Sequence, residues 1–392
     1  MRDRSATSWC VSAPTCRHSN GRDMANSMTV DHTQLTTFVR TVLLRCGLDE
    51  PAATTATEVI CYADIHGFTT HGTNALAGIY APRLRAGSIR PDAQPKVVVE
   101  TPTTAVIDGD NGLGAVTMVT AVDLAAAKAR ELGLGMVTVR NSSHFGSAGY
   151  YTNRVAADGL VGIVMSNCGA QGVVPPLGGV KRLLGTNPLS AAVPVSHGAP
   201  FVLDMSATAV ATGKIRAAQR EGRPVPEGWL VAADGSTTTD PDAYFAGHAD
   251  VAWLGGTAQT GGAKGYGLAL LVDLLCGPLA GAAYGPRPEA LTETEPADDV
   301  NIGQVALVIN PAAFGVAESF PTETRALLDT VSASPAAPGQ RVTYPGAPEA
   351  ERAAVSYAEG IRLPQHVAVQ LVRLGAELDV AVPAALTEAG SA

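Results

Sequence analysis

Two histidines stand in short polar stretches rich in small residues. His144 lies in VRNSSHFGS (139–147), and His71 lies in HGFTTHGTN (66–74). Because imidazole takes up and releases a proton near neutral pH, each is a candidate for general acid/base catalysis. A histidine at the end of a strand is more often an ordinary loop residue, so the residue pattern alone leaves both interpretations open.

The elements beside these histidines predict how they are positioned. Residues 135–139 alternate and are β-branched, as in a strand that ends just before His144. Residues 51–65 have the spacing of an amphipathic helix that runs directly into the segment containing His71. We therefore expect both histidines at the ends of regular elements, where loops commonly carry sites.

The remaining pattern predicts a mixed α and β chain. A first helix starts at Asp31, with an apolar face at Leu35, Phe38, Val39, Val42 and Leu43. We expect Gly375 to stop the last long helix. Other helices are expected at 116–132, 150–158, 267–283, 319–331 and 364–374, and strands at 97–107, 161–165, 191–195, 201–204 and 305–309.

Composition excludes several classes of protein. The 392 residues include 46% hydrophobic ones, enough for a substantial core. A net charge of −9 and the absence of a Lys/Arg run argue against binding to nucleic acid or to an anionic membrane. The six cysteines form no C-x-x-C pair, so we expect reduced thiols, no metal site and a cytoplasmic location. Residues 1–27 are expected to be disordered or an over-long gene start.

The sequence contains no nucleotide-binding fingerprint of the common kinds. Neither G-x-G-x-x-G nor G-x-x-x-x-G-K-[ST] occurs. Composition and pattern alone therefore indicate a mixed α/β protein with glycine-rich loops and two unusual histidines.

A set of ordered motifs extends this interpretation. HGFTTHGTN, DGDNGLG, VRNSSHFGSAGYY, MSNCGAQGVVPPLGG, LGTNPLSAAVP, FVLDMSAT, GKI, GGAKGYGLALLVDLL and YPGAPE follow one another along the chain. Together they resemble the malate/L-lactate dehydrogenase family of non-Rossmann oxidoreductases over roughly residues 30 to 380. The resemblance implies a mixed α+β fold with a helical N-terminal region, an inserted and largely antiparallel-sheet domain for NAD or NADP, and a homodimer.

The resemblance also divides the chain and assigns roles. The expected divisions are a helical region with the first part of the substrate and dimer domain (28–148), the NAD(P)-binding domain (149–285), a return to the substrate domain (286–380) and a flexible tail (381–392). His144 is favoured as the proton donor or acceptor and His71 as its partner or substrate orienter, although the family uses either histidine. His66 is expected to be structural. The expected substrate-binding residues are Thr70, Asn74, Tyr80 and Arg83.

The expected cofactor site combines glycines, amides and two charged groups. Small residues let a phosphate approach the backbone closely, and a lysine before a helix adds positive charge. The residues assigned to the cofactor are Asn167, Gly179, Gly185, Thr186, Asn187, Asp204, Met205, Ser206, Lys264, Gly265, Pro345 and Gly346.

The chain departs from the family pattern in two places, one beside the expected substrate site and one in the expected cofactor site. The family usually has an arginine within a turn of the histidine that matches His71, whereas this chain has none before Arg83 and carries one extra residue before Tyr80. Ala263 also replaces a frequent histidine. The main expectation is hydride transfer between nicotinamide and C2 of a 2-hydroxy or 2-oxo acid. The alternatives are a cyclic imine, a biosynthetic intermediate without a free carboxylate, or an inactive dimeric binding protein.

Overall fold

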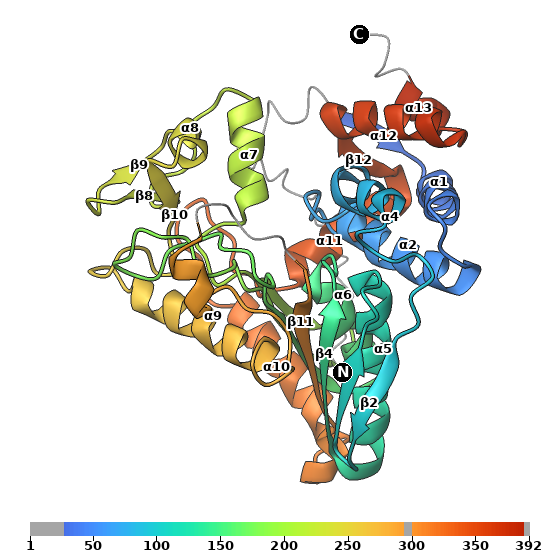
Figure 1. The fold of residues 1–392 in the computed structure, drawn as a ribbon. Helices are drawn as coiled ribbons and strands as arrows, with labels where there is room; N and C mark the ends of the chain where they lie inside the picture. The colour runs from blue at the N-terminus through green and yellow to red at the C-terminus, as the bar shows by residue number, and fades with distance from the viewer. Residues whose placement is uncertain (1–26, 294–299, 388–392) are drawn as a thin grey trace, which may run out of the picture.

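A seven-stranded sheet forms the centre of the molecule (Figure 1). The computed structural model describes residues 27–293 and 300–387. The strand order is β2-β3-β4-β11-β5-β6-β7, and within the described residues β3 and β4 are the single parallel pair of this sheet. The expectation of a largely antiparallel, non-Rossmann sheet is therefore confirmed. The strands are β2 (Lys96–Glu100), β3 (Thr104–Asp108), β4 (Leu134–Ser142), β5 (Val161–Ser166), β6 (Leu189–Val193), β7 (Phe201–Met205) and β11 (Ile302–Ile309).

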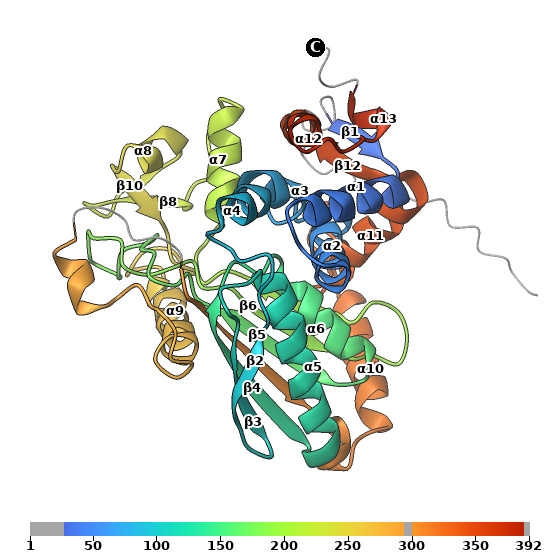
Figure 2. The same ribbon diagram turned by 45° about the vertical axis from the view of Figure 1, so that its right-hand side comes forward.

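Helices cover both faces of this sheet. On one face, α5 (Gly114–Leu132) and α6 (Ala148–Ala157) lie side by side (Figure 2). Gly135 lets α5 approach β4, because a Cβ there would stand 2.0 Å from the carbonyl oxygen of Ala125. On the other face, α9 (Gly262–Cys276) packs Val272 and Cys276 against Val305 of β11. Because side chains alternate between the two faces of a strand, the residues on either side of Val305 point to the opposite face of the sheet, towards α5 and α6.

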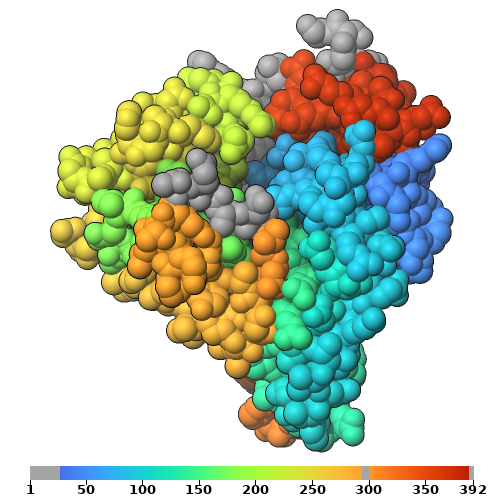
Figure 3. All heavy atoms as spheres, in the orientation of Figure 1, coloured from blue at the N-terminus to red at the C-terminus, as the bar shows by residue number. Residues whose placement is uncertain are grey.

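The two ends of the described chain meet in a helical region. It contains α1 (His32–Arg45), α2 (Glu50–Ile65) and α12 (Gln365–Leu378), with β1 (Ser27–Val30) paired antiparallel to β12 (Ile361–Pro364). Figure 3 shows the blue N-terminal and red C-terminal residues sharing one side of the surface. The predicted apolar face of α1 is confirmed, since all five of its residues are buried.

A smaller region, with a core of its own around Ile215, Leu230 and Trp253, lies on the opposite side of the surface (Figure 3). Its strands are β8 (Leu230–Ala232), β9 (Thr237–Thr238) and β10 (Ala249–Val251), and its helices are α7 (Thr212–Arg220) and α8 (Pro241–Phe245). Further elements are α10 (Ser319–Ser332) and the 3₁₀ helices η2 (Pro288–Leu291) and η3 (Pro311–Phe314).

Two expectations about element boundaries were wrong. The apolar helix predicted at 267–283 begins at Gly262 and ends at Cys276. Gly375 does not stop α12, which continues to Leu378 and ends where Asp379 adopts a left-handed conformation (φ 53°). Gly375 instead permits close packing, because a Cβ there would lie 2.4 Å from Val382 Cγ2.

The predicted domain boundaries stay a prediction. The central sheet contains strands from both sides of these boundaries. β5, β6 and β7 fall in the expected cofactor domain, whereas β4 and β11 of the same sheet fall outside it. Part of the expected C-terminal tail is ordered, since α13 (Ala384–Thr387) buries Leu386. The expected N-terminal extension lies outside the described residues except for Ser27, which begins β1. No helix in the described parts of the chain is long and apolar enough to cross a membrane.

Candidate functional site

A tight loop after α2 positions His71. The chain turns back on the end of the helix, where the Phe68 amide donates to the carbonyl oxygen of Ala63 (2.7 Å) and the His71 amide donates to that of Phe68 (2.9 Å). The Thr70 hydroxyl lies 2.8 Å from Nδ1 of the His71 ring. The ring is therefore oriented through Nδ1.

The polar cluster at the end of β4 holds the strand end in place and lets His144 project from it. Ser143 accepts the Gly114 amide through Oγ (2.9 Å) and donates to the carbonyl oxygen of Gly112 (3.1 Å). The Gln304 side chain donates to the Ser143 carbonyl oxygen (2.9 Å). The serines before His144 are thus scaffold residues, which explains why polar residues follow an apolar strand here.

The structure brings the two predicted histidines together. The ring centroids of His71 and His144 are 5.5 Å apart, and the ring planes differ by 23°. The two residues come from separate elements, the α2 loop and the end of β4, so this pairing depends on the tertiary fold.

The hydrogen bonds of His144 fix its tautomer. Its Nδ1 accepts the Gly146 amide (3.3 Å), and the Tyr80 hydroxyl lies 2.6 Å from the same nitrogen. Because Nδ1 accepts, the neutral ring carries its proton on Nε2. Burial lowers the pKa of His144 to about 3, and the positive charges of His71 and Arg83 act in the same direction. His144 is therefore a neutral hydrogen-bond donor at neutral pH.

His71 has a different electrostatic environment. Burial lowers its pKa, Asp204 opposes that shift, and Lys214 reinforces it. Asp204 itself accepts the Ser147 hydroxyl (2.8 Å) and the Gly149 amide (2.7 Å), while burial raises its pKa. A carboxylate near His71 stabilises the protonated imidazole, an advantage that His144 lacks.

A π-helix accommodates the extra residue noted before Tyr80. The short helix α3 (Thr73–Ala75) continues into the π-helix η1 (Leu76–Tyr80) and then α4 (Ala81–Ala86). A π-turn takes one more residue than an α-turn, which turns the following side chains to a new direction. Tyr80 is thereby buried with its hydroxyl on His144, and Arg83 follows three residues later on the same helical face. Asn74 is partly exposed on α3.

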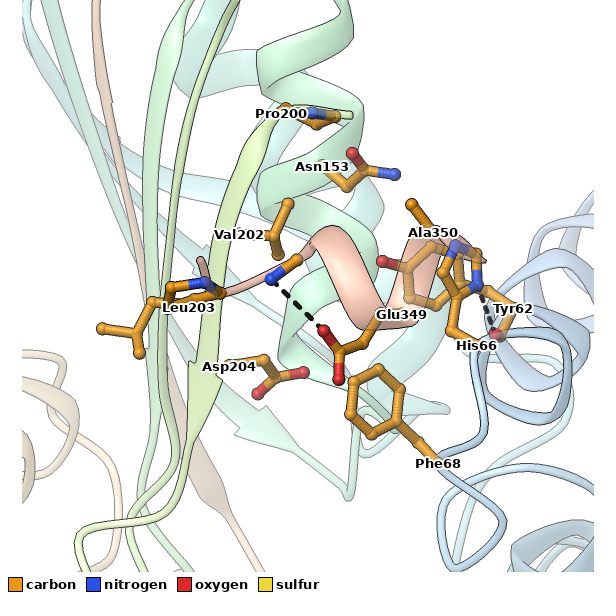
Figure 4. Close-up of a pocket in the computed structure, with 12 residues that line it drawn as sticks. Tyr62, His66, Phe68, Asn153, Pro200, Val202, Leu203, Asp204, Glu349 and Ala350 are labelled. Carbon is orange, nitrogen blue, oxygen red and sulfur yellow. Dashed lines mark hydrogen bonds between the residues drawn. The ribbon is translucent and has the colours of Figure 1, made fainter. Parts of the chain in front are cut away.

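One pocket gathers three of the residues predicted to hold the cofactor (Figure 4). Asp204 from β7 faces Pro345 and Gly346, which precede α11 (Ala347–Glu359). The Val202 amide donates to the Pro345 carbonyl oxygen (3.0 Å), so the strand and the helix start are tied together. The other lining residues are Tyr62, His66, Phe68, Asn153, Pro200, Val202, Leu203, Glu349 and Ala350.

A second group of predicted cofactor residues is used in packing beside α9. Asn167 has all its side-chain groups bonded, to the amides of Gly169 and Gly303 (3.0 Å each) and the carbonyl oxygen of Ala283 (2.8 Å). Asn187 donates to the carbonyl oxygen of Ala269 and to Asp273 (2.8 Å each).

The two glycines and the threonine of this group also pack against or bond to other residues of the chain. A Cβ on Gly265 would stand 2.4 Å from the Leu254 amide nitrogen, and a Cβ on Gly185 would stand 2.4 Å from Asn187 Oδ1. The Thr186 carbonyl oxygen accepts the Ala207 amide (2.9 Å). The structure thus does not bring this group into the pocket beside Asp204.

The remaining predicted cofactor residues are not among those that line the pocket beside Asp204. Gly179 and Lys264 are exposed, and Met205 and Ser206 follow Asp204 at the end of β7, where the Ser206 hydroxyl donates to the Thr208 carbonyl oxygen (3.1 Å).

His66, expected to be structural, is one of the pocket-lining residues. Its ring stacks on Tyr62, and its Nδ1 lies 2.8 Å from the Tyr62 carbonyl oxygen.

Two residues of the site were missing from the sequence-based assignment. Lys214, near His71, belongs to the GKI motif and is one of few lysines, which was the available signal. Glu349 lies in the pocket, raises the pKa of Asp204 and accepts the Gly346 amide (3.2 Å). Nothing in the spacing of YPGAPE indicates that this glutamate faces Asp204 (Figure 4).

Comparison with known proteins gives concordant results. The sequence profile described as malate/L-lactate dehydrogenase matches residues 30–372. A malate dehydrogenase of Pyrococcus abyssi is 37% identical over 75% of this chain and 79% of its own length. An L-sulfolactate dehydrogenase of Methanocaldococcus jannaschii is 36% identical over 86% of this chain and 93% of its own.

Solved structures agree with the sequence comparison. Malate dehydrogenase from Pyrococcus horikoshii OT3 superimposes with a TM-score of 0.81 at 30% identity, covering 91% of this chain and 97% of that one. The Δ1-piperideine-2-carboxylate reductase of Pseudomonas syringae pvar. tomato gives a TM-score of 0.74 at 28% identity, covering 88% and 99%. The family resemblance predicted from the motifs is confirmed: this chain belongs to the malate/L-lactate dehydrogenase family.

Proposed function

We propose that this NAD(P)-dependent dehydrogenase interconverts a small 2-hydroxy acid and the corresponding 2-oxo acid. The observation that carries the proposal is the stacked pair of His71 and His144 beside Asp204. Relatives named for malate and sulfolactate, both 2-hydroxy acids, support this substrate class.

The pocket between β7 and α11 fits the nicotinamide and ribose groups better than the phosphates. Tyr62 and Phe68 offer rings for stacking on a heterocycle, and the carboxylates of Asp204 and Glu349 can accept ribose hydroxyls. When bound, NAD(P) supplies the acceptor for the hydride that leaves C2 in oxidation, and the donor in reduction.

His71 is the proposed proton acceptor in oxidation, which reverses the preference drawn from the sequence. With Nδ1–H donating to Thr70, Nε2 takes the proton of the substrate hydroxyl, and Asp204 stabilises the resulting charge. His144 donates through Nε2–H to the substrate oxygen, held in that tautomer by Gly146 and Tyr80. A neutral His144 cannot match this stabilised acceptor because its surroundings disfavour the charged form.

Arg83 is the proposed partner of the substrate carboxylate, with Thr70 and Asn74 as neighbouring polar contacts. Its charge opposes the burial that raises the pKa of Tyr80 and adds to the burial that lowers the pKa of His144. Ala75, within a turn after His71, is 1% exposed, so a long arginine does not fit there. Ala75→Arg is therefore not expected to supply the missing arginine.

The test is oxidation of NADH and NADPH against pyruvate, oxaloacetate, 2-oxoglutarate, ketopantoate, sulfopyruvate and piperideine-2-carboxylate, followed by absorbance. Turnover of a 2-oxo acid supports the proposal. Turnover of the imine alone supports the second candidate, which the likeness to the Pseudomonas syringae reductase favours. Saturable NADH binding without any turnover on this panel or on carboxylate-free analogues supports an inactive binding protein.

The homodimer is a proposal that rests on the family resemblance, and the cytoplasmic location is a proposal that rests on the scattered cysteines. The edge strand β2 exposes three neighbouring valines, which are 45–55% accessible: Val97, Val98 and Val99. This apolar surface supports a contact with another protein chain. Light scattering should give about twice the chain mass of 40.0 kDa for a dimer.

A further inference from the structure

Asp64 is a buried carboxyl group that the reaction described above does not use. It lies in the last turn of α2 and is 4% exposed. Its Oδ2 accepts the Thr73 amide (2.7 Å). Among the described residues, neither its Oδ1 nor the Thr73 hydroxyl has a hydrogen-bond partner.

The loop that carries His71 returns directly over this carboxyl group. A Cβ on Gly72 would stand 2.0 Å from Asp64 Oδ1, so only glycine lets the backbone pass at this point. On another side of the loop, Gly213 lies against Thr70, where a Cβ would stand 2.9 Å from Cγ2. The turn from Thr70 to Thr73 is therefore held between α7 and the end of α2.

Keeping a carboxyl group in this place costs stability. Burial raises the pKa of Asp64 to about 7, and only its contacts with Thr73 oppose the shift. The neighbouring titratable group on α2 is the buried thiol of Cys61, whose pKa burial raises to about 12, so it contributes no compensating charge. Isolated buried carboxyl groups of this kind are expensive, and their retention points to a function.

We propose that Asp64 is a positioning residue for His71: its carboxyl oxygen holds the Thr73 amide and thereby fixes the turn that presents the imidazole to His144 and the substrate. The inference rests on the proposed role of His71. A loop displaced by about 1 Å is enough to reduce turnover up to about 100-fold.

Asp64→Ala removes the acceptor and should lower kcat about 10- to 100-fold, with the Kd of NADH within about twofold of the parent. Asp64→Asn retains an oxygen for the Thr73 amide and should keep kcat within about threefold of the parent. The same variant should raise Tm at pH 8, because a raised folded pKa means that ionised Asp64 destabilises the fold as pH rises towards 7.

Asp49→Ala is the matched control. Asp49 caps the other end of α2 by accepting the Ala52 amide (2.9 Å), so its loss should lower Tm without changing kcat. Asp64→Ser, too short to reach the Thr73 amide, replaces Asp64→Ala if that variant does not fold.

Unchanged kcat in Asp64→Ala or Asp64→Ser, or an equal loss of kcat in Asp49→Ala, overturns the inference. A parent protein that turns over no 2-oxo acid while binding NADH contradicts the proposed function instead, so the two failures are distinct.

Discussion

The loop around His71 and the segment around Asn167 both combine glycine with small polar residues, yet their polar groups have different partners. Asn167 is saturated by backbone bonds to Gly169, Gly303 and Ala283. His71 is oriented through one nitrogen and faces a second imidazole, and the adjacent Gly72 passes over an Asp64 oxygen that has no hydrogen-bond partner among the described residues.

This difference distinguishes residues that stabilise the fold from residues that can act on a ligand. A side chain whose donors and acceptors are all used inside the protein orders the backbone and has nothing left for a ligand. Titratable groups held in desolvated, incompletely bonded positions are typical of sites that act on ligands. The comparison favours the proposed chemistry at the meeting of α2, β4 and β7, and a packing role for Asn167 beside α9.

The largest expected effect is at His71. His71→Ala should lower kcat by about 10³-fold, since general acid/base groups contribute about 10²–10⁴-fold. His144→Ala removes a hydrogen-bond donor and should cost less, about 10²-fold. Steady-state rates with saturating cofactor measure both, and a larger loss in His144→Ala would restore the role first assigned to that residue.

The next effect concerns the substrate carboxylate. Arg83→Met should lower kcat/KM for a 2-hydroxy acid about 30- to 100-fold, because a charge-assisted pair of about 2–3 kcal/mol is lost. Arg85→Met is the control, since Arg85 pairs with Glu377 on the surface. Equal effects of the two substitutions would remove Arg83 from the site.

The packing role of the residues beside α9 can be tested at Gly265. Gly265→Ala forces a Cβ against the Leu254 and Ala207 backbone, and it should destabilise the protein by about 1–3 kcal/mol. Denaturant unfolding gives the stability, and fluorescence titration gives the Kd of NADH. Weaker NADH binding without loss of stability would assign this residue to the cofactor site after all.

The smallest effects are shifts in pH dependence. In oxidation His71 must be unprotonated, and its pKa lies below 6.5, so kcat/KM should fall only in acid. Lys214→Gln removes a positive charge and should move that fall to higher pH, whereas Asp204→Asn should move it to lower pH. Movement of both variants in one direction would contradict the assignment of these two neighbours.

Sequence patterns were most informative where one segment determines the outcome. The face of α1 from Leu35 to Leu43 and the pairing of residues 96–108 follow from local periodicity. The two histidines were recognisable because their motifs are local. The contact of Tyr80 with His144 and the pocket position of Glu349 depend on segments distant in the chain. Those contacts carry no local signal.

Transfer of deuterium tests the central claim most directly. The 2-hydroxy acid that reacts best, labelled with deuterium at C2, is incubated with NAD⁺ or NADP⁺ and the parent enzyme, and the reduced cofactor is analysed by mass spectrometry. The account predicts one deuterium in the reduced nicotinamide, and the same label formed far more slowly by His71→Ala. Reduced cofactor without deuterium would contradict direct hydride transfer from C2.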